Sequence, residues 1–265
     1  MIAIDWLSQR MGLAASKAAF EEVFMELPPP FDSKIDAATC TSHARRHFVL
    51  FSAGQVMSYS ASAKAKPGQR IIEQPHATKA HSVFKELPPP FDRKIDAAAC
   101  VDKRSRQFVL FSGGQVMLYD AQTSSRVGSR VLEPPRPTKG DAIFGELPPP
   151  FDTKIDAVTC VHETQRKLVL FSGGQMMKYG AAPVWVDAEG FGGRILKPPR
   201  PTKADDVYSE LPPPFDTKID AAVCVNPANR HFVLFSGGQV MQFCSWSYKP
   251  AGERVIELPC STMRI

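Results

Sequence analysis

The sequence predicts an all-β protein, a four-bladed β-propeller with four-stranded blades and short helices at the rim. Two observations predict it. The motif Glu-Leu-Pro-Pro-Pro-Phe-Asp-x-Lys-Ile-Asp-Ala occurs four times, and its second aspartate recurs at spacings of 60, 60 and 64 residues. Each copy is followed by the same apolar and glycine pattern, which is typical of repeated sheets. Because one small sheet buries too little surface alone, stacked blades are favoured over four separate domains.

Each unit is expected to contain four strands. The Ile-Asp-Ala-Ala segment has small side chains, which indicates a buried inner strand close to other backbone. The Phe-Val-Leu-Phe run is β-branched and aromatic and indicates a second strand. A Ser-Gly-Gly or Ser-Ala-Gly turn joins it to a third strand, which begins Gly-Gln-Val-Met in most units. A variable loop, longer in the third unit around Val184–Asp187, leads to a fourth strand of the Arg-Val-Leu-Glu type.

A short helix is expected between units. In the third unit, Thr202 precedes a run from Ala204 to about Tyr208 and Asp205 lies three residues later, which is an N-cap pattern. Leu-Pro-Pro-Pro should end the helix and continue extended into the next unit. The stretch Ser16–Phe24 aligns with this helix, so we expect the N-terminal segment to complete the fourth blade and close the ring.

These patterns predict one domain over residues 16–265, preceded by an extension, residues 1–15, to which no function is assigned. The blades are expected at approximately 26–85, 86–145, 146–209 and 210–262, with 16–25 completing the fourth.

Composition excludes several classes of protein. The 32 basic and 27 acidic residues give a net charge of +5, spread along the chain without a basic run, so nucleic-acid binding is not expected. No apolar stretch reaches the roughly 18 residues of a membrane span. The start contains Asp5 and no basic leader, so no signal peptide is expected and the localisation stays open between the cytoplasm and unconventional secretion.

The six cysteines fall into two sets. Four occupy the same position of each unit and are expected to be buried, separated free thiols: Cys40, Cys100, Cys160 and Cys224. Cys244 and Cys260 both lie in the fourth unit, and whether they form a disulfide is left open. Mostly unpaired thiols are typical of a reducing compartment.

The combination of Lys-Ile-Asp-Ala-Ala with Phe-Val-Leu-Phe-Ser-Gly-Gly-Gln-Val-Met resembles the hemopexin-like repeat family, over roughly residues 16–262. The repeat pattern is most similar to that of stand-alone members such as plant albumin-2-type proteins and bacterial photopexins. The family's aromatic pair after the turn is replaced here, which weakens any transfer of aromatic ligand contacts. The replacements are Val56-Met57, Val116-Met117, Met176-Met177 and Val240-Met241.

The resemblance implies an ion in the central channel. Backbone carbonyls of the inner strands would hold calcium or sodium, with chloride as a further candidate, and hard oxygen ligands suit calcium. The first carbonyl ring would come from Asp36, Asp96, Asp156 and Asp220. A second ring would come from Ala38, Ala98, Val158 and Ala222. The alternative is an ordered water molecule in the same place.

The resemblance also implies haem as a candidate ligand, which requires a strong axial ligand such as histidine. His76 and His81 form a pair that occurs in the first unit alone, and they are the best candidates. His47 and His231 share one position at the start of the second strand in their units. The alternative is that these histidines are ordinary solvated strand residues.

Repeated polar residues suggest a third kind of site. The lysines before each inner strand, together with aspartates two residues earlier, should ring one mouth of the channel with alternating charge: Lys34, Lys94, Lys154 and Lys218 with Asp32, Asp92, Asp152 and Asp216. Arg136 and Arg200 recur near the helix starts. Four equal weak sites would give the avidity that lectins use. Retention by descent, or local ion pairing, is the alternative.

No phosphate-binding loop, zinc-ligand spacing or nucleophile elbow is present. We therefore expect a non-catalytic binding protein whose small ligand is haem, a polyamine or an ion. The alternatives are a multivalent glycan-binding protein and a module for protein contacts or self-association.

Overall fold

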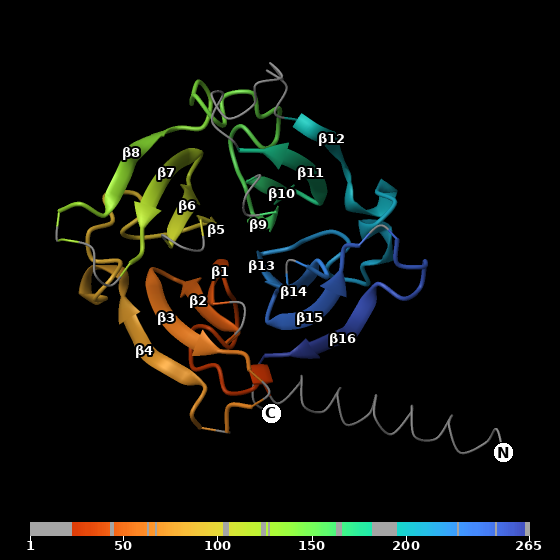
Figure 1. Ribbon diagram of the computed structural model, residues 1–265, viewed down its shortest axis with the longest axis horizontal. Coiled ribbons are helices and arrows are strands. Elements are labelled where there is room, and N and C mark those ends of the chain that lie inside the picture. Colours follow the sequence, from red (N-terminus) through yellow and green to blue (C-terminus); the bar gives the residue numbers. More distant parts are fainter. Residues whose placement is uncertain are drawn as a thin grey trace.

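A computed structural model of the chain contains four four-stranded antiparallel sheets around a central axis (Figure 1), which confirms the predicted four-bladed propeller. The structure describes residues 23–42, 45–62, 64–66, 68–102, 106–122, 126, 128–162, 166–181, 195–226, 228–246 and 248–262.

The strands follow the chain outward from the axis in every blade. Blade one contains β1 (Ala37–Ser42), β2 (His47–Ser52), β3 (Gln55–Ser60) and β4 (Ile71–Ala77). Blade two contains β5 (Ala97–Asp102), β6 (Gln107–Ser112), β7 (Gln115–Asp120) and β8 (Val131–Pro137). Blade three contains β9 (Ala157–His162), β10 (Lys167–Ser172), β11 (Gln175–Gly180) and β12 (Ile195–Pro201). Blade four contains β13 (Ala221–Asn226), β14 (His231–Ser236), β15 (Gln239–Cys244) and β16 (Val255–Ser261).

The inner strands surround the axis because their side chains are small. β1 lies against β5 and β13, and β9 lies against the same two strands, so the four inner strands are mutual neighbours. Ala37 and Ala38 are each 1% exposed, as are Ala97 and Ala98. Larger side chains would collide where four backbones approach one another, which explains the repeated Ile-Asp-Ala segment.

The hydrophobic core consists of four clusters, each shared by two neighbouring blades. Phe84 illustrates the pattern. It packs edge-on against Phe51 of blade one and stacks on Phe108 and Tyr119 of blade two. The Tyr119 hydroxyl donates a 2.6 Å hydrogen bond to the Val83 carbonyl, so the buried polar group is satisfied. Packing between blades, rather than within one sheet, therefore supplies the core.

Blade four obtains the same packing with exchanged residues. Tyr208 stands where the other units have Phe24, Phe84 or Phe144, and Phe243 stands where they have tyrosine. The two rings stack at 5.6 Å. The hydroxyl of Tyr208 faces Ser245, which replaces an alanine of the other units, and burial raises the pKa of Tyr208. In blade four the hydroxyl therefore belongs to the ring before the proline run, Tyr208, instead of the ring on the third strand, and Ser245 is its polar neighbour.

Between the described blades the rim contains single 3₁₀ turns: η1 (Thr78–Ala80), η3 (Thr202–Ala204) and η4 (Tyr208–Glu210). The predicted N-cap at Thr202 is wrong. Its hydroxyl donates instead to the carbonyls of Gly174 and Asp216, at 2.8 and 2.5 Å. Asp205 instead caps the turn that follows, because its Oδ1 accepts hydrogen bonds from the amides of Val207 and Tyr208.

The proline run turns, which corrects the expected extended course. In the first unit, the Phe31 amide donates to the Pro28 carbonyl at 2.8 Å. Phe31 is fully buried and belongs to the core cluster shared by blades one and four. The chain must turn here to direct this ring inward.

A threonine connects each pair of neighbouring blades. Thr138 donates to the carbonyls of Gly114 and Asp152, at 2.6 and 2.9 Å. Thr262 makes the same two bonds, to Gly238 of its own blade and to Asp32 of the first unit. Val23 and Phe24 fill the adjoining core between blades four and one. The extension 1–15 and most of the predicted closing helix, residues 16–22, lie outside the described residues.

None of the six cysteines forms a disulfide in this structure, so Cys244 and Cys260 are not bonded to each other. The four repeated cysteines are buried, as predicted. Among the described residues, no helix has the length and apolar character required to cross a bilayer.

Candidate functional site

The axis contains a small cavity of about 10 Å3 between the inner strands. It is lined by Thr39, Ala99, Thr159 and Val223 at one level, together with their neighbours in each strand. Such a volume is close to the minimum that holds one water molecule or one ion. Neither haem nor a polyamine fits there.

Backbone groups provide the polar lining of this cavity. Each inner strand pairs with one partner only, for example β1 with β2, and its other edge faces the axis. Alternate residues of that edge direct N–H and C=O groups away from the paired strand. Carbonyl rings of this kind offer the hard oxygen ligands that calcium and sodium take, and N–H rings suit an anion. The donor chemistry therefore fits an axial ion.

The aspartate side chains do not belong to that lining. Asp36 Oδ2 accepts a 2.8 Å hydrogen bond from the Ala53 amide in the β2–β3 turn, and Oδ1 lies 2.6 Å from Lys34 Nζ. The other three units repeat both contacts. No cluster of three or more histidine, cysteine or acidic residues with metal-site geometry occurs within the described part of the chain. The aspartate amides donate to the carbonyls of the second strands, so of their backbone groups only the carbonyls remain for an ion, outside the residues that line the cavity.

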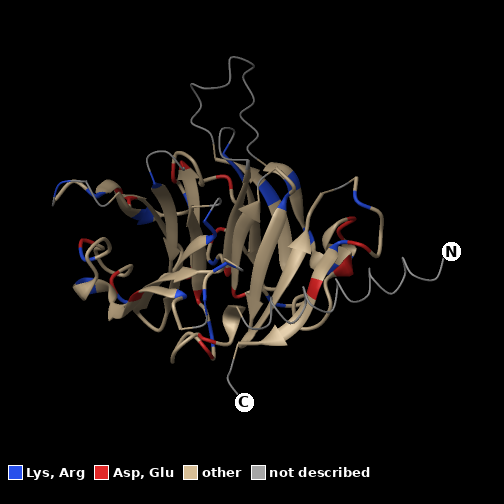
Figure 2. Ribbon diagram, turned by 60° about the horizontal axis from the view of Figure 1, so that its bottom comes forward, with Lys and Arg blue, Asp and Glu red and all other residues tan. Residues whose placement is uncertain are grey.

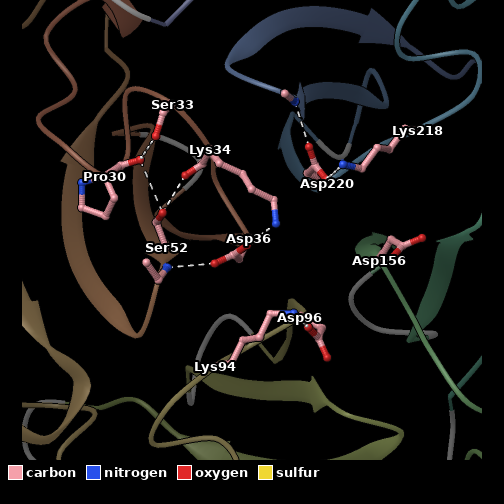
Figure 3. Close-up of polar contacts among 12 residues, drawn as sticks. Pro30, Ser33, Lys34, Asp36, Ser52, Lys94, Asp96, Asp156, Lys218 and Asp220 are labelled. Atoms are coloured by element: carbon pink, nitrogen blue, oxygen red, sulfur yellow. Dashed lines mark hydrogen bonds and ion pairs between the residues drawn. The ribbon is translucent and has the colours of Figure 1, made fainter.

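One mouth of the channel is therefore a ring of four ion pairs. The aspartates Asp36, Asp96, Asp156 and Asp220 come from four blades and lie around the same central space (Figure 3). The hydrogen bond to Asp36 raises the pKa of Lys34, and Asp156 does the same for Lys154. Each lysine charge is compensated locally, so this mouth does not attract an anion strongly.

The lysines pair with the aspartate two residues after them and not with the earlier aspartate. Asp92 instead accepts Lys79 at 2.8 Å, and Asp216 accepts Lys203 at 2.6 Å. Each of these pairs spans the junction between consecutive units. The earlier aspartates are thus connecting residues of the ring.

Arg136 and Arg200 lie at the same position of β8 and β12 but have different partners. Arg136 forms ion pairs with both Glu133 and Asp141. At the corresponding place in blade three, Lys197 pairs with Asp205 at 2.6 Å, and the Nε of Arg200 is buried without a hydrogen-bond partner in the structure. The two arginines therefore do not form equivalent sites.

His81 has no nitrogen available for haem. It is 1% exposed, its Nδ1 accepts the amide of Val83 at 3.0 Å, and its Nε2 lies 3.0 Å from a Glu73 carboxylate oxygen. It thus replaces the capping aspartate that the next two units have at Asp141 and Asp205. His76 is exposed, with its ring 6.5 Å from that of His81.

Burial lowers the pKa of His81, with further effects from Glu73, His76 and Arg130. The unfolded chain takes up a proton near the ordinary pKa of 6.5, whereas folded His81 stays neutral to lower pH. The free energy of unfolding should therefore fall as the pH is lowered below about 6.5. The double variant His76→Arg/His81→Asp has the residues that blade two carries at these positions, Arg136 and Asp141. Its free energy of unfolding, measured by chemical denaturation, should fall less steeply over the same pH range. Equal slopes would contradict the assignment, because the remaining histidines are common to both proteins.

His47 and His231 begin β2 and β14 and are half-buried. Burial lowers the pKa of both, assisted for His47 by Arg45 and Arg106, and for His231 by Lys249 and Arg46. They therefore face different gaps between blades, and the structure does not bring them together with His76 and His81.

Sequence reasoning missed four arginines that occupy one position in every unit. Arg46, Arg106, Arg166 and Arg230 immediately precede the second strand, and all have positive φ angles, 51°, 49°, 45° and 51°. The available signal was an arginine kept at a turn where glycine or asparagine is favoured. The lysine ring and outer-strand arginines were more conspicuous, yet ion pairs neutralise most of them.

No protein-family profile matches the chain, and no curated protein matches it either. Similar solved structures do exist. A hemopexin-fold protein, CP4 from cow pea, superimposes with a TM-score of 0.65 at 15% identity, covering 86% of this chain and 93% of that one. A plant albumin from Cicer arietinum described as showing hemagglutination gives 0.65 at 14%, covering 86% and 93%. A lectin with two metal-binding sites from the same plant gives 0.62 at 14%, covering 82% and 88%. The chain therefore has the hemopexin fold.

Proposed function

We propose that this hemopexin-fold propeller is a non-catalytic binding protein that holds one cation, calcium or sodium, in its axial channel. The observation that carries the proposal is the ion-sized cavity bordered by the unpaired edges of four inner strands. Backbone carbonyls buried without a partner are unfavourable, and an ion satisfies several of them together. The cation would join all four blades at their closest approach.

The cation's identity follows from the oxygen ligands and the lack of side-chain carboxylates. Calcium accepts six to eight irregular oxygen ligands, whereas magnesium requires near-octahedral geometry with retained water. A cavity of about 10 Å3 leaves no room for retained water. Chloride would instead occupy a level at which amide groups converge.

Calcium is expected to raise the melting temperature of chelator-treated protein, and sodium less so, because both bind the folded ring and not the unfolded chain. Magnesium at the same concentration is the matched control and should have little effect. Native mass spectrometry should find one calcium ion per chain. No bound ion and no change in melting temperature with calcium or sodium would contradict the proposal.

Haem and polyamines receive less support as ligands. Both nitrogens of His81 are engaged, which leaves exposed His76 as the remaining member of the predicted pair. The aspartates of the channel mouth are paired with lysines, which a polyamine would have to displace.

Glycan binding is the alternative function, and hemagglutination by a plant albumin of the same fold supports it. The gaps between blades are not equivalent along their outer parts. The third strands place Ser58, Leu118, Lys178 and Gln242 at one position. Four equal sites would therefore have to use groups that all units share.

A further inference from the structure

The four arginines that precede the second strands are held in an unfavourable backbone conformation. A residue with a side chain in the left-handed region costs about 1–2 kcal/mol, and glycine or asparagine avoids most of it. Arg46, Arg106, Arg166 and Arg230 all adopt it. Strain that recurs in four places suggests that the side chain, and not the backbone, is required.

The surrounding turns have diverged, so shared descent alone does not explain the arginines. The four segments are His-Ala-Arg-Arg-His, Lys-Arg-Ser-Arg-Gln, Glu-Thr-Gln-Arg-Lys and Pro-Ala-Asn-Arg-His. The three positions before the common arginine, and the one after it, vary in residue type and charge. Only the arginine is constant.

The fold uses only the main chain of these residues. The Arg46 carbonyl accepts the Ala61 amide at 2.9 Å, and the other three carbonyls accept the equivalent amides at 2.9–3.0 Å. Glycine would supply the same carbonyl without strain. None of the four guanidinium groups forms an ion pair or hydrogen bond with a described residue, and all four are at least partly exposed.

The four arginines lie on one face of the ring, which we call the arginine face. Topology places the first hairpin turns and the β3–β4-type loops on this face, opposite the glycine turns and the lysine–aspartate mouth. Basic residues occur in loops on both faces (Figure 2), but those of the opposite mouth are paired with aspartates. Glu253 is the sole acidic residue within the described loops of the arginine face, although Asp102 and Asp120 end the adjoining strands. Three glutamates also contact these loops, and each is paired with a loop arginine: Glu26, Glu86 and Glu210.

Each arginine is directed into the gap with the preceding blade. Arg166 lines a cavity of about 20 Å3 with Leu118 of blade two, and the same cavity is lined by Glu133 and Asp141, whose charges are paired with Arg136. The charge of Arg106 helps to lower the pKa of His47 in blade one, and the charge of Arg46 does so for His231 in blade four. The four guanidinium groups therefore form a ring of separate sites, one for each gap.

The gap between blades three and four contains basic groups without an ion pair among the described residues, beside the paired Lys197, Asp205 and Asp206. Lys178 lies there near Arg230, and it forms no ion pair with a described residue. Burial lowers the pKa of Lys178, Asp205 raises it, and Lys197 and Arg230 lower it further. The buried, unpaired Nε of Arg200 belongs to the same blade. An anion bound here would relieve the repulsion among these groups.

We propose that the arginine face binds a sulfated glycan, with the sulfate esters at the four arginines and the strongest contact between blades three and four. Guanidinium groups bind tetrahedral oxyanions through paired hydrogen bonds, which lysine cannot do. This inference goes beyond the axial cation and does not depend on it.

The arrangement favours a sulfated glycan over nucleic acid. Proteins that bind single-stranded nucleic acid alternate cations with aromatic stacking platforms along a groove. Among the described residues, the exposed aromatic side chains are Trp246 and Tyr248, both in blade four. A ring of cations without aromatic partners in the other blades suits multiple anionic groups on a flexible polar chain.

Isothermal titration with a size-defined heparin oligosaccharide, repeated at several salt concentrations, tests the proposal. Arg166→Asn/Arg230→Asn should weaken binding at least tenfold and reduce the salt dependence, since contacts to the anion are lost. The matched control Arg93→Gln/Lys139→Gln removes the same charge from exposed, unpaired positions on the opposite face and should change affinity less than twofold. Asparagine tolerates the left-handed conformation, so the first variant should unfold at the same temperature as the wild type or higher.

Three outcomes would overturn the assignment: equal affinity of the two double variants, equal binding of a desulfated oligosaccharide of the same length, or tighter binding of single-stranded RNA than of heparin. Calcium-dependent melting of the same proteins measures the axial site separately, so failure of one proposal leaves the other measurable.

Discussion

Replacing Gly114 with alanine is expected to lower the free energy of unfolding by roughly 3 kcal/mol, far more than the same change at its neighbour Gly113. Gly114 has a φ angle of +72°, and an added Cβ would lie 2.9 Å from the Thr153 carbonyl oxygen of the next blade. The left-handed conformation costs alanine about 1–2 kcal/mol, and forcing atoms into a packed region adds a further 1–3 kcal/mol. The clash is with backbone, which cannot move without moving a blade.

Gly113 provides the matched control. Its φ angle is +55°, but nothing lies within 4 Å of an added Cβ. Blade one already has alanine here, since Ala53 adopts a φ angle of 49°. Gly113→Ala should therefore cost only about 1 kcal/mol. Urea denaturation of the two variants gives the comparison, and equal losses would show that close approach between blades does not limit this position.

The second large effect is expected at Thr262, where valine keeps the shape and removes the hydroxyl. The carbonyls of Gly238 and Asp32 lose the hydroxyl donor, at a cost of about 1–3 kcal/mol. Thr138→Val is the control, because Thr138 makes the same contacts to Gly114 and Asp152. Blades two and three stay linked by the chain from 138 to 152, whereas no peptide links residue 262 to residue 32.

We therefore expect Thr262→Val to destabilise the protein more than Thr138→Val and to open the ring locally. Hydrogen exchange should accelerate in β16 and in residues 23–36 before it does so in blade two. If the two variants lose equal stability and exchange uniformly, the junction of blades four and one is no weaker than the others.

The repeat determined which parts of this structure could be predicted. Period and residue type together identified the blades and the innermost position of Ala37 and Ala38. These features follow from hydrophobic burial, which a linear pattern records. The exchange of Phe84 and Tyr119 for Tyr208 and Phe243 could likewise have been found by comparing units.

Polar partners were harder to predict, because sequence separation does not distinguish them. Lys34 is two residues from both Asp32 and Asp36, yet only the second is held at the channel mouth by the β2–β3 turn. Thr202 has the sequence context of a helix cap, but two carbonyls from other segments take its hydroxyl. The strain at Arg166 depends on a φ angle, which the sequence does not state.

The threonine contacts carry a consequence for how the chain can be arranged. At all four junctions between blades a threonine hydroxyl donates to an aspartate carbonyl of the next blade. At three of them the chain also passes directly from one blade to the next, and at the fourth it does not. The arrangement of the blades in the ring therefore does not depend on which blade comes first along the chain. The chain could be opened at any of the three spanned junctions with every sheet left intact, provided that a linker joined residue 262 to residue 23.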